Sequence, residues 1–202
     1  MDETSTESFK HIILCVEQTP SMGYTISHKT TIMDAVNKGV TAFTNVFKES
    51  TVKANVTSIT FDTKCQIAHE VSIETFTPNY SVQKNGTVRI ADVLNMAAEH
   101  FRTLSGDLYI IFISDGIVDP GEDEESLAEA IARTREFNSY AVGFSSSNGK
   151  KSLDCLLDCY TNKQIVSFDK QQSYIDELKA IANEIIQHVS PCGKRKGEGS
   201  EY

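Results

Sequence analysis

The sequence lacks the features that mark a disulfide-stabilised, secreted or membrane-spanning protein. It has five cysteines, an odd number, and none of them forms a C-x-x-C pair, which fits a reducing compartment better than a disulfide scaffold. The segment 1–10 is polar and acidic without an apolar core, so no secretory signal is predicted. The longest purely apolar run, Leu108 to Ile113, is far too short to cross a bilayer. We therefore expect a cytoplasmic protein with no membrane partner.

Basic residues are also scarce relative to acidic ones. The chain has 19 Lys and Arg against 28 Asp and Glu, which gives a formal net charge of −9. A nucleic-acid-binding face needs clustered Lys and Arg, so no nucleic-acid partner is expected. The 202 residues, 40% hydrophobic and 23% charged, are enough for one globular domain with a sizeable core. We predict a flexible N-terminus over residues 1–8, a domain over 9–190, and a polar, disordered tail over 191–202.

Apolar residues follow strand and helix periodicities in turn along the chain. Uniformly apolar runs at Ile12–Val16 and Leu108–Ile113 predict strands that are buried on both faces. Apolar stripes with spacings of three and four residues predict amphipathic helices. The expected strands are 12–16, 55–61, 65–73, 108–113, 140–144 and 164–168, and the expected helices are 32–48, 87–104, 126–137, 151–159 and 174–189.

Strands that alternate with helices predict an α/β fold. We expect a doubly wound, mostly parallel central sheet with helices on both faces and one antiparallel edge strand. The antiparallel strand is 65–73, because only a short turn joins it to the preceding strand. The two most apolar strands, 12–16 and 108–113, should be central. In such sheets ligands bind beyond the carboxyl ends of the strands, where the winding direction reverses.

Side chains with oxygen atoms follow both of the expected central strands. Glu17, Thr19 and Ser21 come directly after the first one, and in an extended loop alternate residues point the same way. They would offer one carboxylate and two hydroxyls to a single point. Asp115 follows the second central strand, and Thr87 begins a helix that returns across the sheet at the same rim. Five oxygen donors are thus predicted to converge on a site for a hard cation.

This pattern resembles von Willebrand factor type A (vWA) domains. Their signature is a strand followed by D-x-S-x-S-M, a G-T helix start, and a strand followed by S/T-D-G; the corresponding residues here are Glu17-x-Thr-x-Ser-Met22, Gly86-Thr87 and Ser114-Asp115-Gly116. The resemblance extends from about residue 9 to residue 189 and implies a Rossmann-like fold. It also implies a metal-ion-dependent adhesion site (MIDAS) made by Glu17, Thr19, Ser21, Thr87 and Asp115. The helix segment Asp34–Val40 looks most like the intracellular bacterial branch that includes tellurium-resistance-associated members, which serve stress responses.

The resemblance implies a cofactor and a kind of partner. The cofactor would be Mg²⁺, or Mn²⁺ or Ca²⁺, and the partner a protein that contributes an Asp or Glu carboxylate. The chain would then be a metal-dependent protein-binding module. We expect no enzymatic activity, because no His in these motifs could act as a general base and no nucleophile–base pair is visible. Two residues depart from the commonest pattern: Glu17 is longer than Asp by one methylene, and Thr19 adds a methyl group to Ser.

Two alternatives remain open. The departures at Glu17 and Thr19 are consistent with a decayed metal site, which would leave an interaction scaffold indifferent to chelators. A receiver-like phosphotransfer domain also has an Asp at the carboxyl end of a strand, but it needs clustered acids after the first strand and a Lys after a late strand. Here the first segment is rich in hydroxyls, and Lys150 and Lys151 come well beyond the strand that ends at Phe144.

Overall fold

A six-stranded sheet forms the centre of the molecule. The computed structural model describes residues 9–27, 29–84, 86, 89–115, 121, 123–134, 137–144, 162–166 and 171–188. The strands lie in the order β5-β4-β1-β6-β7-β8. Their bounds are β1 Lys10–Glu17, β4 Ala54–Phe61, β5 Cys65–Ser72, β6 Asp107–Ser114, β7 Asn138–Phe144 and β8 Asn162–Val166, and the helices are α1 Ile32–Lys48, α2 Ile90–Phe101, α3 Glu124–Thr134 and α5 Gln171–Gln187.

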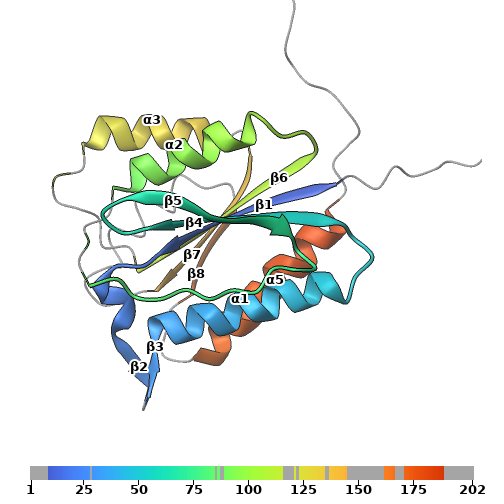
Figure 1. Cartoon of the computed structure of the whole chain (residues 1–202), viewed down its shortest axis with the longest axis horizontal. Coiled ribbons are helices and arrows are strands. Elements are labelled where there is room, and N and C mark those ends of the chain that lie inside the picture. Colours follow the sequence, from blue (N-terminus) through green and yellow to red (C-terminus); the bar gives the residue numbers. More distant parts are fainter. Residues whose placement is uncertain are drawn as a thin grey trace, which may run out of the picture.

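The sheet is parallel except at one edge. β1 pairs in parallel with β4 and β6, the pairs β6–β7 and β7–β8 are also parallel, and β5 is antiparallel to β4. Helices α1 and α5 cover one face of the sheet, and α2 and α3 cover the other (Figure 1). The predicted fold class is therefore confirmed, including the antiparallel edge strand and the central positions of β1 and β6.

The core is divided into two layers by β1. Ile12, Leu14 and Val16 pack in the cluster that contains the buried residues of α1 and α5. Ile13 and Cys15 pack in the cluster that contains those of α2 and α3. Because successive side chains of a strand point to opposite faces, a strand covered on both faces needs apolar residues at consecutive positions. This requirement explains the uninterrupted apolar run from which the strand was predicted.

Helix α1 begins where the sequence predicts, with Thr31 as its N-cap. The Thr31 hydroxyl accepts a hydrogen bond from the backbone N–H of Asp34 at 3.1 Å. The Asp34 carboxylate in turn accepts one from the backbone N–H of Thr31 at 2.9 Å. This reciprocal capping box satisfies backbone donors that have no partner within the helix, and its hydrogen bonds lower the pKa of Asp34. The helix direction over the sheet is thus set at its first turn.

Some short elements and one exposed surface differ from the predictions. A 3₁₀ helix, η1 (Pro20–Gly23), and a small hairpin of β2 (Thr25–Ser27) and β3 (Thr30–Thr31) were not predicted. Apolar and polar residues alternate over 65–73, which is typical of a half-exposed edge strand, but nearly the whole length of β5 is exposed, with Ile67 at 45%. The predicted helix 151–159, the N-terminal segment and the C-terminal tail lie outside the described residues. In the described part, no helix is both long enough and apolar enough to span a membrane.

Candidate functional site

The carboxyl ends of β4, β1 and β6 meet at one edge of the sheet. Glu17 of β1 lies in register with Phe61 of β4, and Val16 lies in register with Ile113 of β6. Ser114 is the last residue of β6, so the next residue emerges beside Glu17. The parallel register thereby joins two segments that are 98 positions apart in the chain.

Glu17 points into the protein and connects the two central strands. The residue is only 1% exposed. Its Oε2 atom accepts hydrogen bonds from the Ser114 hydroxyl at 2.5 Å and from the backbone N–H of Asp115 at 3.2 Å. Its Oε1 atom accepts a hydrogen bond from the Thr19 hydroxyl. Both carboxylate oxygens are therefore engaged within the protein, and the longer glutamate side chain crosses from β1 to the end of β6.

Thr19 and Ser21 lie beside Glu17, although not in the extended loop that was predicted. The prediction is wrong beyond Thr19, since residues 20–23 form η1 and the Met22 N–H donates to the Thr19 carbonyl at 3.1 Å. Pro20 favours this turn because its φ is fixed near the helical value. The hydroxyl oxygens of Thr19 and Ser21 still lie 2.8 Å apart. The loop keeps this shape because the Met22 side chain is fully buried in the core.

Asp115 is the fourth predicted donor that the structure places at this edge. It is 3% exposed, and its backbone hydrogen bond holds it against Glu17. Thr87, the fifth, lies outside the described residues. Of its described neighbours in sequence, Gly86 packs against the β4–β5 turn, where an added Cβ would lie 3.1 Å from the Cβ of Asp62. The four described donors form one hydrogen-bonded cluster, which we call the rim cluster: Glu17, Thr19, Ser21 and Asp115.

Burial and a neighbouring charge raise the pKa of Glu17 to about 7. The largest cause is the loss of hydration, and the second is repulsion by the Asp115 carboxylate. The hydrogen bonds from Ser114, Thr19 and the Asp115 backbone act in the opposite direction. Among the described residues, no positively charged side chain contributes to the shift of the Glu17 pKa. A divalent cation at this edge would compensate the charge that burial makes costly.

The chemistry of the rim cluster fits a hard cation. Carboxylate and hydroxyl oxygens suit Mg²⁺, Mn²⁺ or Ca²⁺, whereas zinc and copper favour nitrogen and sulfur ligands. Within the described residues, no three His, Cys, Asp or Glu side chains gather in a way that could hold a metal ion. The rim cluster contains two such residues, Glu17 and Asp115, and hydroxyls supply its other oxygens. Any ion held there would keep an electrophilic character because neutral hydroxyls are weak donors.

Sequence reasoning missed two features that support the rim cluster. The first is the Ser114 hydroxyl, which belongs to the S-D-G motif but was assigned no role. The second is a pair of backbone hydrogen bonds that hold the segment after β1 in place. The Gln83 N–H donates to the Gln18 carbonyl at 2.7 Å, and the Gln18 N–H donates to the Phe61 carbonyl at 2.8 Å. A cleft of about 330 Å³ opens beside these residues, with Lys64 among those that line it. No spacing in the sequence indicates these backbone contacts.

Solved structures identify the fold. The PilB minor pilin from Streptococcus sanguinis matches with a TM-score of 0.67 at 14% identity, over 92% of this chain and 63% of the pilin. A von Willebrand factor type A protein from Catenulispora acidiphila matches with a TM-score of 0.66 at 16% identity, over 89% of this chain and 43% of that protein. The vWF domain of the type V pili tip protein Mfa5 from Porphyromonas gingivalis matches with a TM-score of 0.61 at 10% identity, over 93% of this chain and 99% of that domain.

The chain thus has the fold of vWA domains, as the resemblance in the sequence implies. It spans about 63% of the length of the pilin it matches. No family model matches the sequence, and no curated protein matches it either. At these identities the likeness shows the fold alone. The metal ion, the acidic partner and the bacterial branch remain predictions.

Proposed function

We propose that the chain is a non-enzymatic protein-binding module that holds a divalent cation at the rim cluster and captures an acidic residue of a partner protein. The observation that carries this proposal is the burial of two carboxylates, Glu17 and Asp115, beside the paired hydroxyls of Thr19 and Ser21. The fold adds support, because it is shared with a pilus adhesin, SpaC from Lactobacillus rhamnosus. We propose Mg²⁺ as the ion, with Mn²⁺ and Ca²⁺ as alternatives.

The residues of the rim cluster and Thr87 have different roles in this proposal. Thr19 and Ser21 hold the cation through their hydroxyl oxygens. Asp115 supplies negative charge, and Thr87 contributes its hydroxyl when a partner carboxylate is bound. Glu17 positions the others, because it accepts hydrogen bonds from the Thr19 hydroxyl and the Asp115 backbone. The bound ion would supply a Lewis-acidic position at which an Asp or Glu oxygen of the partner replaces water.

We propose a cytoplasmic location for this module, on the basis of the odd number of cysteines without C-x-x-C pairs. The segment Asp34–Val40 supports placing it in the intracellular, tellurium-resistance-associated branch of vWA proteins. A role in stress response would follow from that placement.

Calorimetric titration of the full chain with MgCl₂ and MnCl₂ tests the metal site. We expect one saturable site in the wild type and an affinity at least tenfold weaker (~1.4 kcal/mol) in Asp115→Asn, because a charged oxygen is replaced by a neutral amide. The matched control is Asp176→Asn, which makes the same change at an exposed position on α5 and should bind both ions as the wild type does. Equal affinity of Asp115→Asn and the wild type would contradict the assignment.

A second candidate function is an interaction scaffold without a metal ion. It is favoured by the hydrogen bonds that already occupy both oxygens of Glu17. In that case the wild type would bind neither ion, and its melting temperature would be the same in EDTA and in ~10 mM MgCl₂. A rise in melting temperature with MgCl₂ that is absent from Asp115→Asn would instead support the metal-dependent module.

A further inference from the structure

A second surface with the chemistry of a binding site lies between α2 and α3. It is a cleft of about 290 Å³ with an apolar floor that includes Leu104, Leu108 and Phe137, and it is lined at its rim by Arg102 and Arg133. Arg102 is the C-cap of α2, and Leu108 is the second residue of β6. The cleft is therefore at the amino end of β6, whereas the rim cluster is at its carboxyl end. An eight-residue strand separates the two sites by roughly 25 Å.

The floor of the cleft is apolar surface that the described part of the chain leaves partly uncovered. Leu104, Leu108 and Phe137 are only partly buried, although they pack against the core cluster beneath α2 and α3. The ring of Phe137 lies against the buried ring of Phe101, with a centroid distance of 4.7 Å and an interplanar angle of 60°. The floor is thus held in place by an aromatic pair and forms an apolar surface of defined shape.

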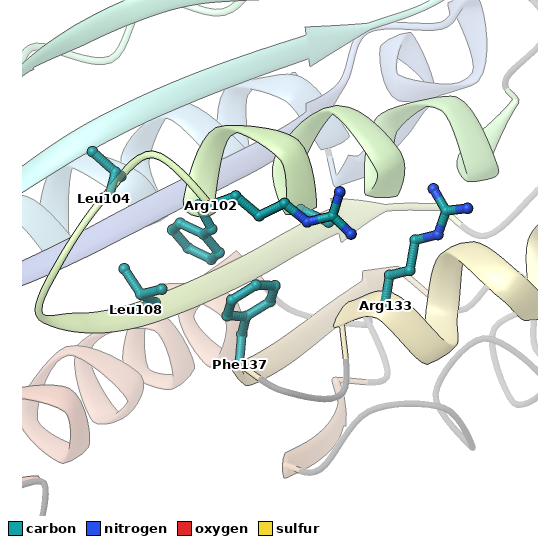
Figure 2. Close-up of a pocket in the computed structure, with 7 residues that line it drawn as sticks. Arg102, Leu104, Leu108, Arg133 and Phe137 are labelled. Carbon is teal, nitrogen blue, oxygen red and sulfur yellow. The ribbon is translucent and has the colours of Figure 1, made fainter. Parts of the chain in front are cut away.

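The two arginines place positive charge beside this apolar surface. Figure 2 shows the Arg102 side chain extending along α2 toward Arg133, with Phe137 below them. Arg133 donates to the Asn95 side chain at 3.2 Å, which holds its guanidinium at the seam of the two helices. Its pair with Glu129 is exposed, with a separation of 4.0 Å, so it contributes little. The Arg102 guanidinium makes no hydrogen bond or ion pair with any described residue.

Charge and shape together indicate the occupant. In a chain with a net charge of −9, two arginines that line one apolar cleft form a local positive site for an anionic group. The planar guanidinium forms paired hydrogen bonds with a carboxylate. The cleft is open on one side and smaller than most pockets that enclose a small molecule, which are roughly 300–1,000 Å³. Such a cleft suits a single large side chain of a protein partner, and arginine and aromatic residues are enriched at the energetic centres of interfaces.

We propose that this cleft is a second, metal-independent interaction site that binds a short acidic segment of a partner protein. The segment seats one aromatic or large aliphatic side chain on Leu104, Leu108 and Phe137. A neighbouring Asp or Glu carboxylate then pairs with Arg102 and Arg133. Binding here requires neither a cation nor the rim cluster, because the two sites lie at opposite ends of β6.

Selection from a phage-displayed library of random peptides tests this proposal, with the full chain as bait and EDTA present throughout. We expect enrichment of peptides in which an acidic residue lies next to Phe, Tyr, Trp or Leu. The same selection against the double variant Arg102→Gln/Arg133→Gln should lose this enrichment. The matched control is Arg89→Gln, since Arg89 is also exposed but lies at the start of α2 and pairs with Asp92; it should select the wild-type set.

The affinity of one enriched synthetic peptide then separates the contributions of charge and apolar surface. Binding should weaken at least fivefold in either single arginine variant, and also when the acidic residue of the peptide is replaced by its amide. Binding should be unchanged in Asp115→Asn, so failure of the metal site and failure of the cleft give different results. Enrichment without an acidic–apolar pair, equal binding by the double variant, or no enriched peptide at all would overturn the proposal.

Discussion

Glu17 combines deep burial, a raised pKa and three hydrogen bonds in a single side chain. Its pKa of about 7 in the fold exceeds the value of about 4.5 for an exposed glutamate. The folded protein therefore keeps a proton on this carboxyl over a pH range in which the unfolded chain has already lost it. Stability from this source is present at low pH and is lost as the pH rises from about 4.5 through 7.

The first prediction concerns this pH dependence in the metal-free protein. Between pH 5 and pH 8 in EDTA, the free energy of unfolding of the wild type should fall by on the order of 3 kcal/mol more than that of Glu17→Gln. The glutamine can still accept hydrogen bonds from Ser114 and the Asp115 backbone, while its amide faces the Thr19 hydroxyl. Urea unfolding at a series of pH values measures the difference.

The control for this prediction is Glu125→Gln, at an exposed position in the first turn of α3. It should follow the wild type at every pH. Parallel pH profiles for the wild type and Glu17→Gln would show that Glu17 does not titrate in this range. With MgCl₂ present, the loss of stability at high pH should shrink, since an ion favours the ionised carboxylates.

The sequence identified the members of the rim cluster but not the orientation of Glu17. Strand ends and motif spacing bring Glu17, Thr19, Ser21 and Asp115 to one edge, because parallel strands end on the same side. Whether the Glu17 side chain points outward or inward depends on its register with β6 and on the Ser114 hydroxyl. Both belong to the tertiary structure and are not visible in the sequence. The change to a 3₁₀ turn after Thr19 is local, and Pro20 was the signal that could have predicted it.

At the scale of elements, helices α1 and α5 approach each other closely at Gly39. A Cβ added at Gly39 would lie 2.6 Å from the Tyr174 ring and 2.8 Å from a Leu178 methyl group. Both partners are fully buried, so neither has space into which it can move. Glycine is present here because of close approach, despite its cost to the helix.

The second prediction is that Gly39→Ala destabilises the protein by about 1–3 kcal/mol. Alanine is a better helix former than glycine by up to ~1 kcal/mol, so overpacking against α5 has to outweigh that gain. Chemical denaturation measures the change. The control is Asn45→Ala on the exposed side of the same helix, which should be neutral or slightly stabilising. If Gly39→Ala raises the stability as well, the tight α1–α5 contact is not present in solution.

Long elements were predicted well because their periodicity is repeated over many residues. Helix α1 has a clear stripe and a recognisable cap, and both of its ends agree with the prediction. The hairpin of β2 and β3 consists of three and two residues, which is too short for any period to be visible. The exposure of β5 could not be predicted either, since alternation shows that a strand has two faces but not that a helix covers one of them.

At the scale of the whole molecule, the apolar content of the strands predicted which of them lie in the centre of the sheet, but not the position of every strand. It placed β1 and β6 in the centre, because strands buried on both faces are near-continuous apolar runs. The positions of β7 and β8 depend on the handedness of their connections.

A buried polar contact lies at the opposite edge of the sheet, where the parallel strands begin. Lys10 is 4% exposed and donates to the His188 carbonyl at 2.7 Å, across 178 positions of the chain.

The third prediction tests whether this contact joins the two ends of the fold. The Lys10 ammonium also lies 3.3 Å from the Asp107 carboxylate and 3.3 Å from the Tyr109 hydroxyl. Lys10→Met should cost about 3 kcal/mol, because it removes one partner of a buried ion pair and leaves the other charge in place. Lys10→Met/Asp107→Asn should cost less than the two single changes added together, with a coupling of ~1–3 kcal/mol in a urea-unfolding cycle. Hydrogen exchange at the end of α5 should accelerate in Lys10→Met, since the His188 carbonyl loses its donor. If the stability losses of the two single variants are additive and hydrogen exchange in α5 is unchanged, Lys10 only fills space, and helix packing alone holds α5 on the sheet.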